Sequence, residues 1–177
     1  MTKESLFKAL GLFIEAFRPY VVLKLTEKAG DRWDKWFYEA LSDGQKENWD
    51  LGIGNGTPPV NLIDFHHLKS FAIKYKELLK TDFGRDTNKL PTWLQEIADV
   101  RHKCNHFQEV EERDMRRAFD NMVDIANILK LKELKVEIER LQKGEVIEPV
   151  IHETSAAYGL VPWFKNVIPH LDIRQGN

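Results

Sequence analysis

LPTWLQEIADVRHKCNH, at Leu90–His106, shows which class of fold the chain adopts. Its apolar side chains recur at steps of three and four residues, the period of an amphipathic helix; they are Trp93, Leu94, Ile97, Val100 and Cys104. Pro91 stands where first-turn prolines are favoured. The stretch ends in RHKCNH, at Arg101–His106, where most side chains are basic or titratable. We therefore predict a helix that carries a polar cluster near its end.

The helical period continues toward the N-terminus. We expect a helix that begins near Leu6, kinks at Pro19 and stops at Gly30. Asp31 is expected to cap a short helix, DRWDKWFYEAL, whose aromatic face we interpret as core rather than a platform for stacking bases. The segment Ser42–Pro59 holds four of the ten glycines and two prolines, so we interpret it as a surface loop.

The helical period also continues toward the C-terminus. One helix is expected to open at Asn61 or Asp64 and to run to about Phe83. After a polar run, the apolar stripe of Met115–Leu129 predicts another helix, and the pattern then extends at a new pitch to a stop at Gly144. The expected fold is all-α, a bundle of five or six helices followed by a short irregular C-terminal tail.

The last part of the sequence, residues 145–177, differs from the rest. It has three prolines and no helical period, and only its opening EVIEPVI could form a strand. Its apolar residues have no evident element to fold against. We therefore expect a domain over residues 1–144, then a linker and the start of a further region of a longer protein. An extended tail that packs back on the bundle is the alternative.

Composition limits the classes of function. The formal net charge is −2, so any contact with nucleic acid must come from a local patch of positive charge. The single cysteine, Cys104, excludes an internal disulfide and favours a reducing, cytoplasmic compartment. No stretch approaches 18 uncharged apolar residues, so we expect a soluble protein without a membrane-spanning helix.

The cluster RHKCNH combines residue types that suit phosphodiester chemistry. The guanidinium of Arg101 can grip two phosphate oxygens, and the imidazole of His106 can take or give a proton near neutral pH. Attack by a ribose 2′-hydroxyl on its own phosphate needs no metal and leaves a cyclic phosphate, so the substrate would be RNA. The candidate RNA-binding residues around the motif are Lys103, Asn105, Arg113, Arg116 and Arg117.

Helical geometry separates the two central residues of this cluster. Arg101 and His106 lie roughly 140° apart on an ideal helix, at about 100° per residue. Arg101 shares a face with Asn105, and His102 shares a face with His106. For Arg101 and His106 to meet one phosphate, the helix must loosen near His106 or a second copy must complete the site.

Two other interpretations of the cluster remain open. Arg101 could pair with Glu96 or Asp99 and leave both histidines at a solvated helix end. Alternatively, His102 and His106 have the i, i+4 spacing of helical metal ligands. Zinc needs three or four ligands, however, and the sequence places no further ligand beside this pair.

Four segments, taken in order, resemble the HEPN superfamily, and within it the Swt-type branch. They are ALGLFIEAFRPYVVLKL at Ala9–Leu25, GDRWDKWF at Gly30–Phe37, LQEIADVRHKCNH at Leu94–His106 and MRRAFDNMVDIANIL at Met115–Leu129. The resemblance covers roughly Leu6–Leu129. It implies a helical bundle that dimerises with its motifs facing each other, often as a metal-independent endoribonuclease without a cofactor.

Residue roles follow from the same resemblance. Arg101 would be the phosphate-binding arginine, His106 the catalytic histidine, and His102 a supporting catalytic residue. The chain departs from the usual pattern, because His102 stands where asparagine is commoner and Asn105 where a small residue is usual. Many domains of this superfamily serve only to bind or to dimerise, so a non-catalytic module is the alternative.

The tail carries a second resemblance. VPWFKNVIPHLDIRQGN, at Val161–Asn177, is similar to the opening of large bacterial and archaeal ATPases that carry such a domain at the N-terminus. Several of these ATPases belong to phage-defence or DNA-modification loci. No phosphate-binding glycine-rich loop occurs in the 177 residues, so the expected ATPase partner would lie beyond Asn177 in the same polypeptide.

Overall fold

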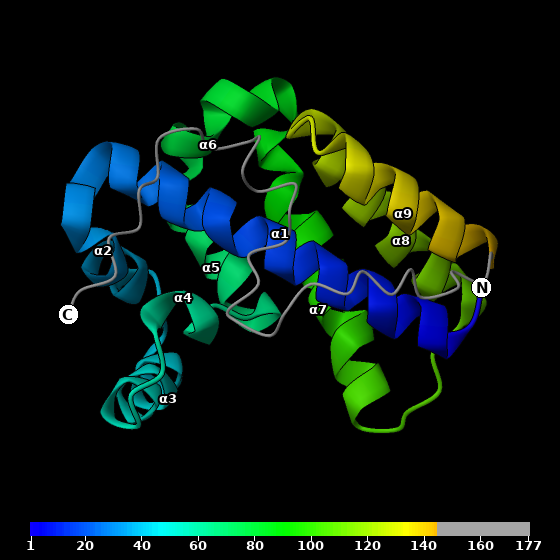
Figure 1. The fold of residues 1–177 in the computed structure, drawn as a ribbon, viewed down its shortest axis with the longest axis horizontal. Helices are drawn as coiled ribbons and strands as arrows, with labels where there is room; N and C mark the ends of the chain where they lie inside the picture. The colour runs from blue at the N-terminus through cyan, green and yellow to red at the C-terminus, as the bar shows by residue number, and fades with distance from the viewer. Residues whose placement is uncertain (145–177) are drawn as a thin grey trace, which may run out of the picture. The chain divides into compact units, whose positions relative to one another are not determined.

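The longest element is helix α1 (Lys3–Ala29), which extends along the bundle in Figure 1. The structure is a computed structural model and describes residues 1–144. A capping box between Thr2 and Ser5 starts α1, and its buried face includes Leu6, Phe13, Phe17, Val21 and Leu25. The helix continues through Pro19 and is not divided into two halves. The missing N–H of Pro19 removes one hydrogen bond, which the packed apolar face on both sides outweighs.

Two short 3-10 helices and eight α-helices follow α1 in the described residues. They are η1 (Gly30–Arg32), α2 (Trp33–Glu39), α3 (Asp43–Gly54), α4 (Pro59–Leu62), α5 (Phe65–Lys74), α6 (Lys76–Phe83), η2 (Gly84–Asn88), α7 (Leu90–Asn105), α8 (Glu112–Ile128) and α9 (Lys132–Lys143). Helix α7 packs against α5 and α8, α8 packs against α9, and α9 packs against α1 (Figure 1). The described residues contain no strand, and the predicted all-α bundle is confirmed.

The loop predicted for Ser42–Pro59 is wrong, because α3 occupies most of it. Ser42 starts α3 with a capping box, and Trp49 is buried with only 5% of its surface exposed. Gly52 lies against the end of the Leu62 side chain, where a Cβ atom would come within 2.4 Å of Cδ2. Glycine at this position permits close packing of α3 on α4. The number of glycines in a segment does not by itself tell such packing from a loop.

The single helix expected to end near Phe83 is divided into α5 and α6. Asp64 is the N-cap of α5, which confirms one of the two predicted helix starts, Asn61 or Asp64. The backbone leaves the helical region at Tyr75, where φ is −106° and ψ is 28°. The Tyr75 hydroxyl donates a hydrogen bond to the carbonyl of Trp36 in α2. This break coincides with a contact between distant parts of the chain. The break and the unexpected helices α3 and α4 are the reasons why the described residues hold more helices than the five or six predicted.

The C-terminal part of the bundle follows the predicted pattern. The buried stripe of α8 consists mainly of Ala118, Phe119, Met122, Ile125 and Ala126. Gly144 ends α9 in the left-handed conformation, with φ of 77°, as expected of a helix stop. The predicted linker, and the EVIEPVI segment within it, lie outside the described residues. Within residues 1–144, no helix has both the length and the apolar character that crossing a bilayer requires.

His67, in the capping box of α5, makes the stability of the bundle depend on pH. Its Nδ1 accepts the N–H of Asp64 at 3.1 Å, and its ring packs edge-on against Phe37 and Trp49. Burial, with a smaller contribution from the charge of His66, lowers the pKa of His67 to about 4. Between pH 6.5 and 4, the unfolded chain therefore binds a proton that the folded chain does not.

We predict that the free energy of unfolding falls by about 3 kcal/mol through His67 alone as the pH drops from 6.5 to 4. The His67→Gln variant keeps an acceptor of the capping box but does not titrate, so its stability should fall less over the same range. Urea unfolding of both proteins at several pH values between 4 and 7 measures the difference. Parallel pH profiles would contradict the prediction.

Candidate functional site

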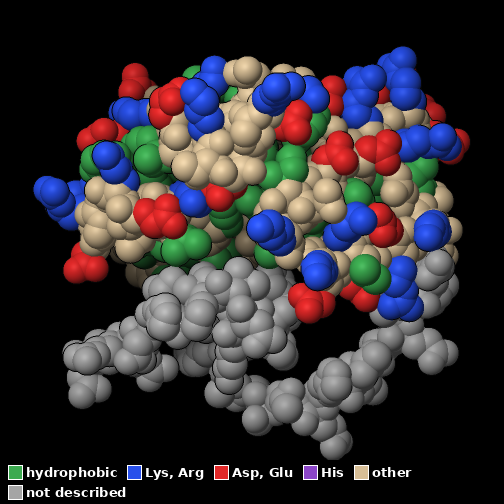
Figure 2. All heavy atoms as spheres, turned by 90° about the horizontal axis from the view of Figure 1, so that it is seen from above, with side chains coloured by type: hydrophobic (Ala, Val, Ile, Leu, Met, Phe, Trp, Pro, Cys, Tyr) green, Lys and Arg blue, Asp and Glu red, His purple; other side chains and the backbone are tan. Residues whose placement is uncertain are grey.

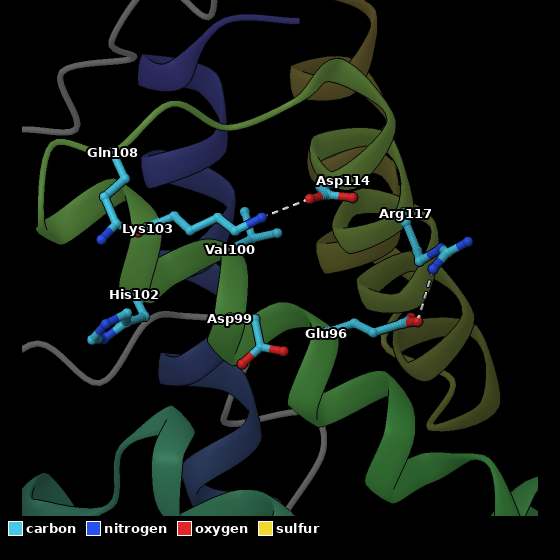
Figure 3. Close-up of a pocket in the computed structure, with 8 residues that line it drawn as sticks. All are labelled: Glu96, Asp99, Val100, His102, Lys103, Gln108, Asp114 and Arg117. Atoms are coloured by element: carbon cyan, nitrogen blue, oxygen red, sulfur yellow. Dashed lines mark hydrogen bonds and ion pairs between the residues drawn. The ribbon is translucent and has the colours of Figure 1, made fainter.

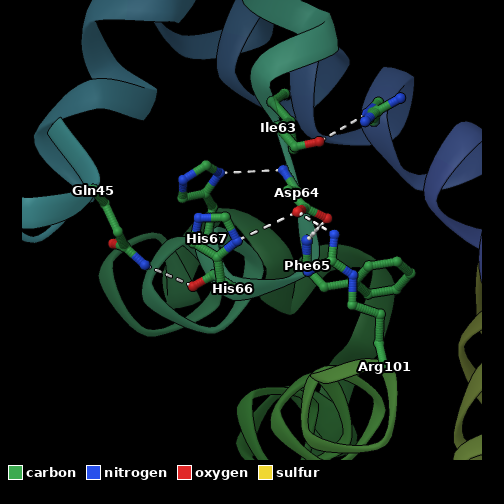
Figure 4. A network of polar contacts seen from close by, with 8 residues as sticks. Gln45, Ile63, Asp64, Phe65, His66, His67 and Arg101 are labelled. Carbon is green, nitrogen blue, oxygen red and sulfur yellow. Dashed lines mark hydrogen bonds and ion pairs between the residues drawn. The ribbon is translucent and has the colours of Figure 1, made fainter. Parts of the chain in front are cut away.

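Arg101 projects from the last turns of α7 toward the start of α5. Its Nη2 lies 2.8 Å from Oδ2 of Asp64, and the two side chains remain 34% and 27% exposed (Figure 4). Of the interpretations left open by the sequence, a pairing of Arg101 with Glu96 or Asp99 is not found, because Arg101 forms its ion pair with a residue 37 positions earlier. Asp64 is a site residue that the sequence identified only as a possible helix cap.

The carboxylate of Asp64 has several donors around it. Its Oδ1 accepts the N–H of Phe65 at 2.7 Å, and Nδ1 of His66 lies 3.4 Å from Oδ2 (Figure 4). Burial by itself would raise the pKa of Asp64, but these two donors and the charge of Arg101 outweigh it and lower the pKa to about 2. Asp64 is therefore ionised at neutral pH and holds Arg101 in place.

A second arginine shares the pocket into which Arg101 opens. Arg18 of α1, Arg101 and Asn105 line an open hollow of about 320 Å³, whose apolar wall includes Phe7, Leu10 and Ile14. Nε of Arg18 donates to the carbonyl of Ile63 at 2.7 Å. Burial lowers the pKa of Arg18 and the charge of Asp64 opposes that shift; an arginine nevertheless stays protonated in proteins. The signal that could have identified Arg18 was its place in the Arg-Pro-Tyr segment.

The two histidines of the motif lie on the other face of α7, as helical spacing predicted. Their side chains are exposed, and the ring centroids of His102 and His106 are 4.3 Å apart. His106 is the C-cap residue, with φ of −95° and ψ of 17°. His102 lines a separate hollow of about 370 Å³, together with Lys103 and Arg117 (Figure 3). His106 lines neither this hollow nor the pocket of Arg101.

The other predicted RNA-binding cations are paired with carboxylates. Their ion pairs are Lys103–Asp114 at 2.8 Å, Arg116–Glu112 at 3.1 Å, Arg117–Glu96 at 3.2 Å and Arg113–Glu111 at 3.6 Å. The hollow beside His102 is lined by three carboxylates and two cations (Figure 3). Figure 2 likewise shows acidic and basic side chains interspersed over the face that it displays. Within one chain, the structure does not bring these cations into one groove with Arg101.

The metal interpretation of the motif lacks ligands in the described part of the chain. Within residues 1–144, no three His, Cys, Asp or Glu side chains form a group that could hold a metal ion. Cys104 is buried, and burial raises the pKa of its thiol. His102 and His106 thus remain a pair of adjacent imidazoles.

The arrangement supplies two kinds of chemistry at the end of α7. The pocket between α1, α5 and α7 offers two guanidinium groups and the Asn105 amide, which suits an anion such as a phosphate. The exposed turn beyond it offers the imidazoles of His102 and His106, a side-chain type that serves as a general acid or base. Both belong to the six-residue motif or to residues that contact it.

Comparison with known proteins identifies the family. No curated protein and no solved structure matches the chain. A sequence model described as Swt1-like HEPN matches residues 8–130, which is more than half of the chain. The matched range contains Arg18, Asp64 and the whole of α7, and so includes the charged residues of the Arg101 pocket and His102. The chain is thus a HEPN module and belongs to the Swt1-like HEPN family.

Proposed function

We propose that this HEPN module is a metal-independent endoribonuclease that works as a homodimer. The observation that carries the proposal is the placement of Arg101. Its side chain is 34% exposed in an open pocket that also holds Arg18, on the helix whose end presents His106 to solvent. A phosphate-binding group and a proton-transfer group thus lie within five residues of each other.

The reaction needs only these groups and the RNA. Arg101 binds the non-bridging oxygens of the scissile phosphate, while the imidazole of His106 accepts the proton of the ribose 2′-hydroxyl. The 2′-oxygen then bonds to phosphorus and the bond from phosphorus to the 5′-oxygen breaks. The leaving oxygen takes a proton from a second imidazole, and the products are a 2′,3′-cyclic phosphate and a 5′-hydroxyl. His102 supports His106 as its ring neighbour.

A second copy of the chain would bring a His106 imidazole close to Arg101. Arg101 opens into the pocket between α1, α5 and α7, whereas His106 lies against His102 on another face of α7. A two-fold axis near the end of α7 would bring each motif opposite itself, so that Arg101 of one copy meets His106 of the other. The proposed site is therefore completed by dimerisation.

We further propose that the domain of residues 1–144 serves a larger NTPase with a role in phage defence. The support is the resemblance of Val161–Asn177 to the opening of ATPases that carry such a domain. In that arrangement the residues from 145 onward form the linker and the start of the ATPase region. The NTPase would control when the ribonuclease acts.

A non-catalytic module is the second candidate, and a specific observation favours it. Arg101 is paired with Asp64, and Lys103, Arg113, Arg116 and Arg117 are all paired with acids. Cations that are neutralised within the chain attract RNA less than free ones. In that case the domain would dimerise the NTPase or bind its nucleic acid without cutting it.

We predict that the isolated domain is a symmetric dimer with the end of α7 in its interface. Light scattering at tens of micromolar should give twice the mass of the chain. In a solved dimer, Arg101 of one copy and His106 of the other should lie close enough to contact the same phosphate. A monomer at that concentration, or a dimer with both motifs facing away from each other, would contradict the proposal.

The Arg101→Ala and His106→Ala variants should lose RNase activity by about 10²-fold or more while remaining folded. Their Tm should change little, because both side chains lie near a helix end and are at least partly exposed. The matched control is Arg85→Ala, which removes an exposed arginine from η2. Gel assays should show cleavage that survives EDTA and leaves cyclic phosphate ends. The assignment would be refuted if a variant with both substitutions cut RNA as well as the parent chain, or if cleavage occurred only with added divalent metal.

RNA binding by the domain should weaken steeply with salt, because released counterions drive binding to phosphates. The Arg101→Ala variant should reduce the slope of log K against log salt by about one, and Arg85→Ala should leave it unchanged. Titrations of labelled RNA between about 50 and 200 mM salt measure both slopes. Binding that ignores salt, or that is absent at low ionic strength, would favour the non-catalytic module.

A further inference from the structure

Phe107, directly after the motif, has an unusual backbone conformation. Its φ is 54°, in the left-handed region that glycine favours. Two hydrogen bonds define the turn, from the N–H of Phe107 to the carbonyl of Cys104 at 3.2 Å and from the N–H of Gln108 to that of Lys103 at 2.9 Å. This is the Schellman arrangement at a helix C-terminus, where the residue in the position of Phe107 is usually glycine.

The side chain of Phe107 is also unusually exposed. It is 96% exposed, the largest fraction among the exposed large apolar residues of the described chain. A bulky residue with positive φ is strained, and an aromatic ring in water forgoes the stabilisation of burial. The fold gains from neither property, because glycine would form the same turn with less strain. Such outliers cluster at functional sites, so we infer that the Phe107 ring contacts a ligand or another molecule.

The surroundings of Phe107 indicate what that contact is. Phe107 lines a hollow of about 570 Å³ with Lys3, Phe7, Cys104 and Asn105, and no carboxylate lies among these residues. Phe7 is itself 45% exposed. Phe7 and Asn105 also line the pocket of Arg101, so the two hollows adjoin. An aromatic surface thus continues directly into the guanidinium pocket.

The charges of the two adjoining hollows favour an anionic ligand. Their lining contains three cations, Lys3, Arg18 and Arg101, and one acid, Asp64. The lining is therefore net positive, on a chain whose net charge is −2. The hollow beside His102 has three acids and two cations, and therefore the opposite sign. A ligand that carries phosphates beside flat aromatic groups matches a surface that places guanidinium groups beside aromatic rings.

We propose that Phe107 is a base-stacking residue, which binds a nucleobase of single-stranded RNA next to the phosphate held by Arg101. The proposal rests on the ribonuclease function above and specifies its substrate. Single-stranded RNA has unpaired bases that stack on aromatic side chains, whereas a duplex keeps its bases inside the helix. Phe107 and Phe7 then form the base subsite, and Arg101 and Arg18 form the phosphate subsite.

The Phe107→Gly variant tests this proposal without endangering the fold. Glycine accepts the left-handed conformation, so the thermal stability of the variant should stay the same or rise. Its affinity for a short single-stranded oligouridylate should fall by about 5- to 150-fold, the range of one base–aromatic stack. Phe107→Tyr should retain the affinity. The control is Leu51→Ala, which removes an exposed apolar side chain from α3.

The RNA provides a second set of comparisons. The parent chain should bind an oligouridylate with one abasic position more weakly than the intact oligomer. The Phe107→Gly variant should bind the two oligomers equally well. A duplex of the same length should not distinguish the parent chain from Phe107→Gly. These results separate stacking on the ring from general attraction to phosphates.

Three outcomes would overturn the proposal. If Phe107→Gly binds the single strand as the parent does while Arg101→Ala does not, the ribonuclease function stands and the base subsite is wrong. If Phe107→Gly converts a dimer into a monomer in light scattering, the ring is a contact between copies. If the parent neither binds nor cuts RNA at low ionic strength, the proposed function fails and the base subsite fails with it.

Discussion

The ion pair between Asp64 and Arg101 is the interaction on which the site depends. It joins the first residue before α5 to the last turns of α7, and the same carboxylate caps α5 through the N–H of Phe65. A negative charge at a helix N-terminus is stabilised by the unpaired N–H groups and the helix dipole. The carbonyl of Ile63, one residue earlier, binds Arg18 of α1. Three separate segments of the chain therefore meet at the turn formed by Ile63 and Asp64.

This pairing fixes Arg101 without consuming its capacity to bind an anion. A guanidinium has five N–H donors in a planar fork, and the contact with Asp64 uses Nη2. The arginine remains one-third exposed, so its other donors face the pocket that Arg18 and Asn105 also line. A guanidinium already held in one orientation loses less rotational freedom when a ligand binds. The carboxylate thus acts as an anchor that leaves room for a phosphate.

The sequence predicted the features that depend on local spacing and missed those that depend on distant contacts. Helical period placed Arg101 and Asn105 on one face of α7 and the two histidines on another, and the structure agrees. Local spacing offered only Glu96 and Asp99 as partners for Arg101, because Asp64 comes near it only through the packing of α5 on α7. The break at Tyr75 has the same origin, since its hydroxyl binds a carbonyl of α2.

The pairing of charges in the folded chain is a property that the order of residues in the sequence does not reveal. The candidate RNA-binding cations Lys103, Arg113, Arg116 and Arg117 each form an ion pair with an acid in the folded chain. Net positive lining occurs instead around Arg101, where Arg18 and Lys3 arrive from the far end of the sequence. His102 lines the hollow with excess negative charge, whereas His106 lines neither of the hollows around Arg101. A phosphate bound at Arg101 would therefore lie among cations, and in the proposed dimer the imidazole of His106 that acts on it comes from the second copy.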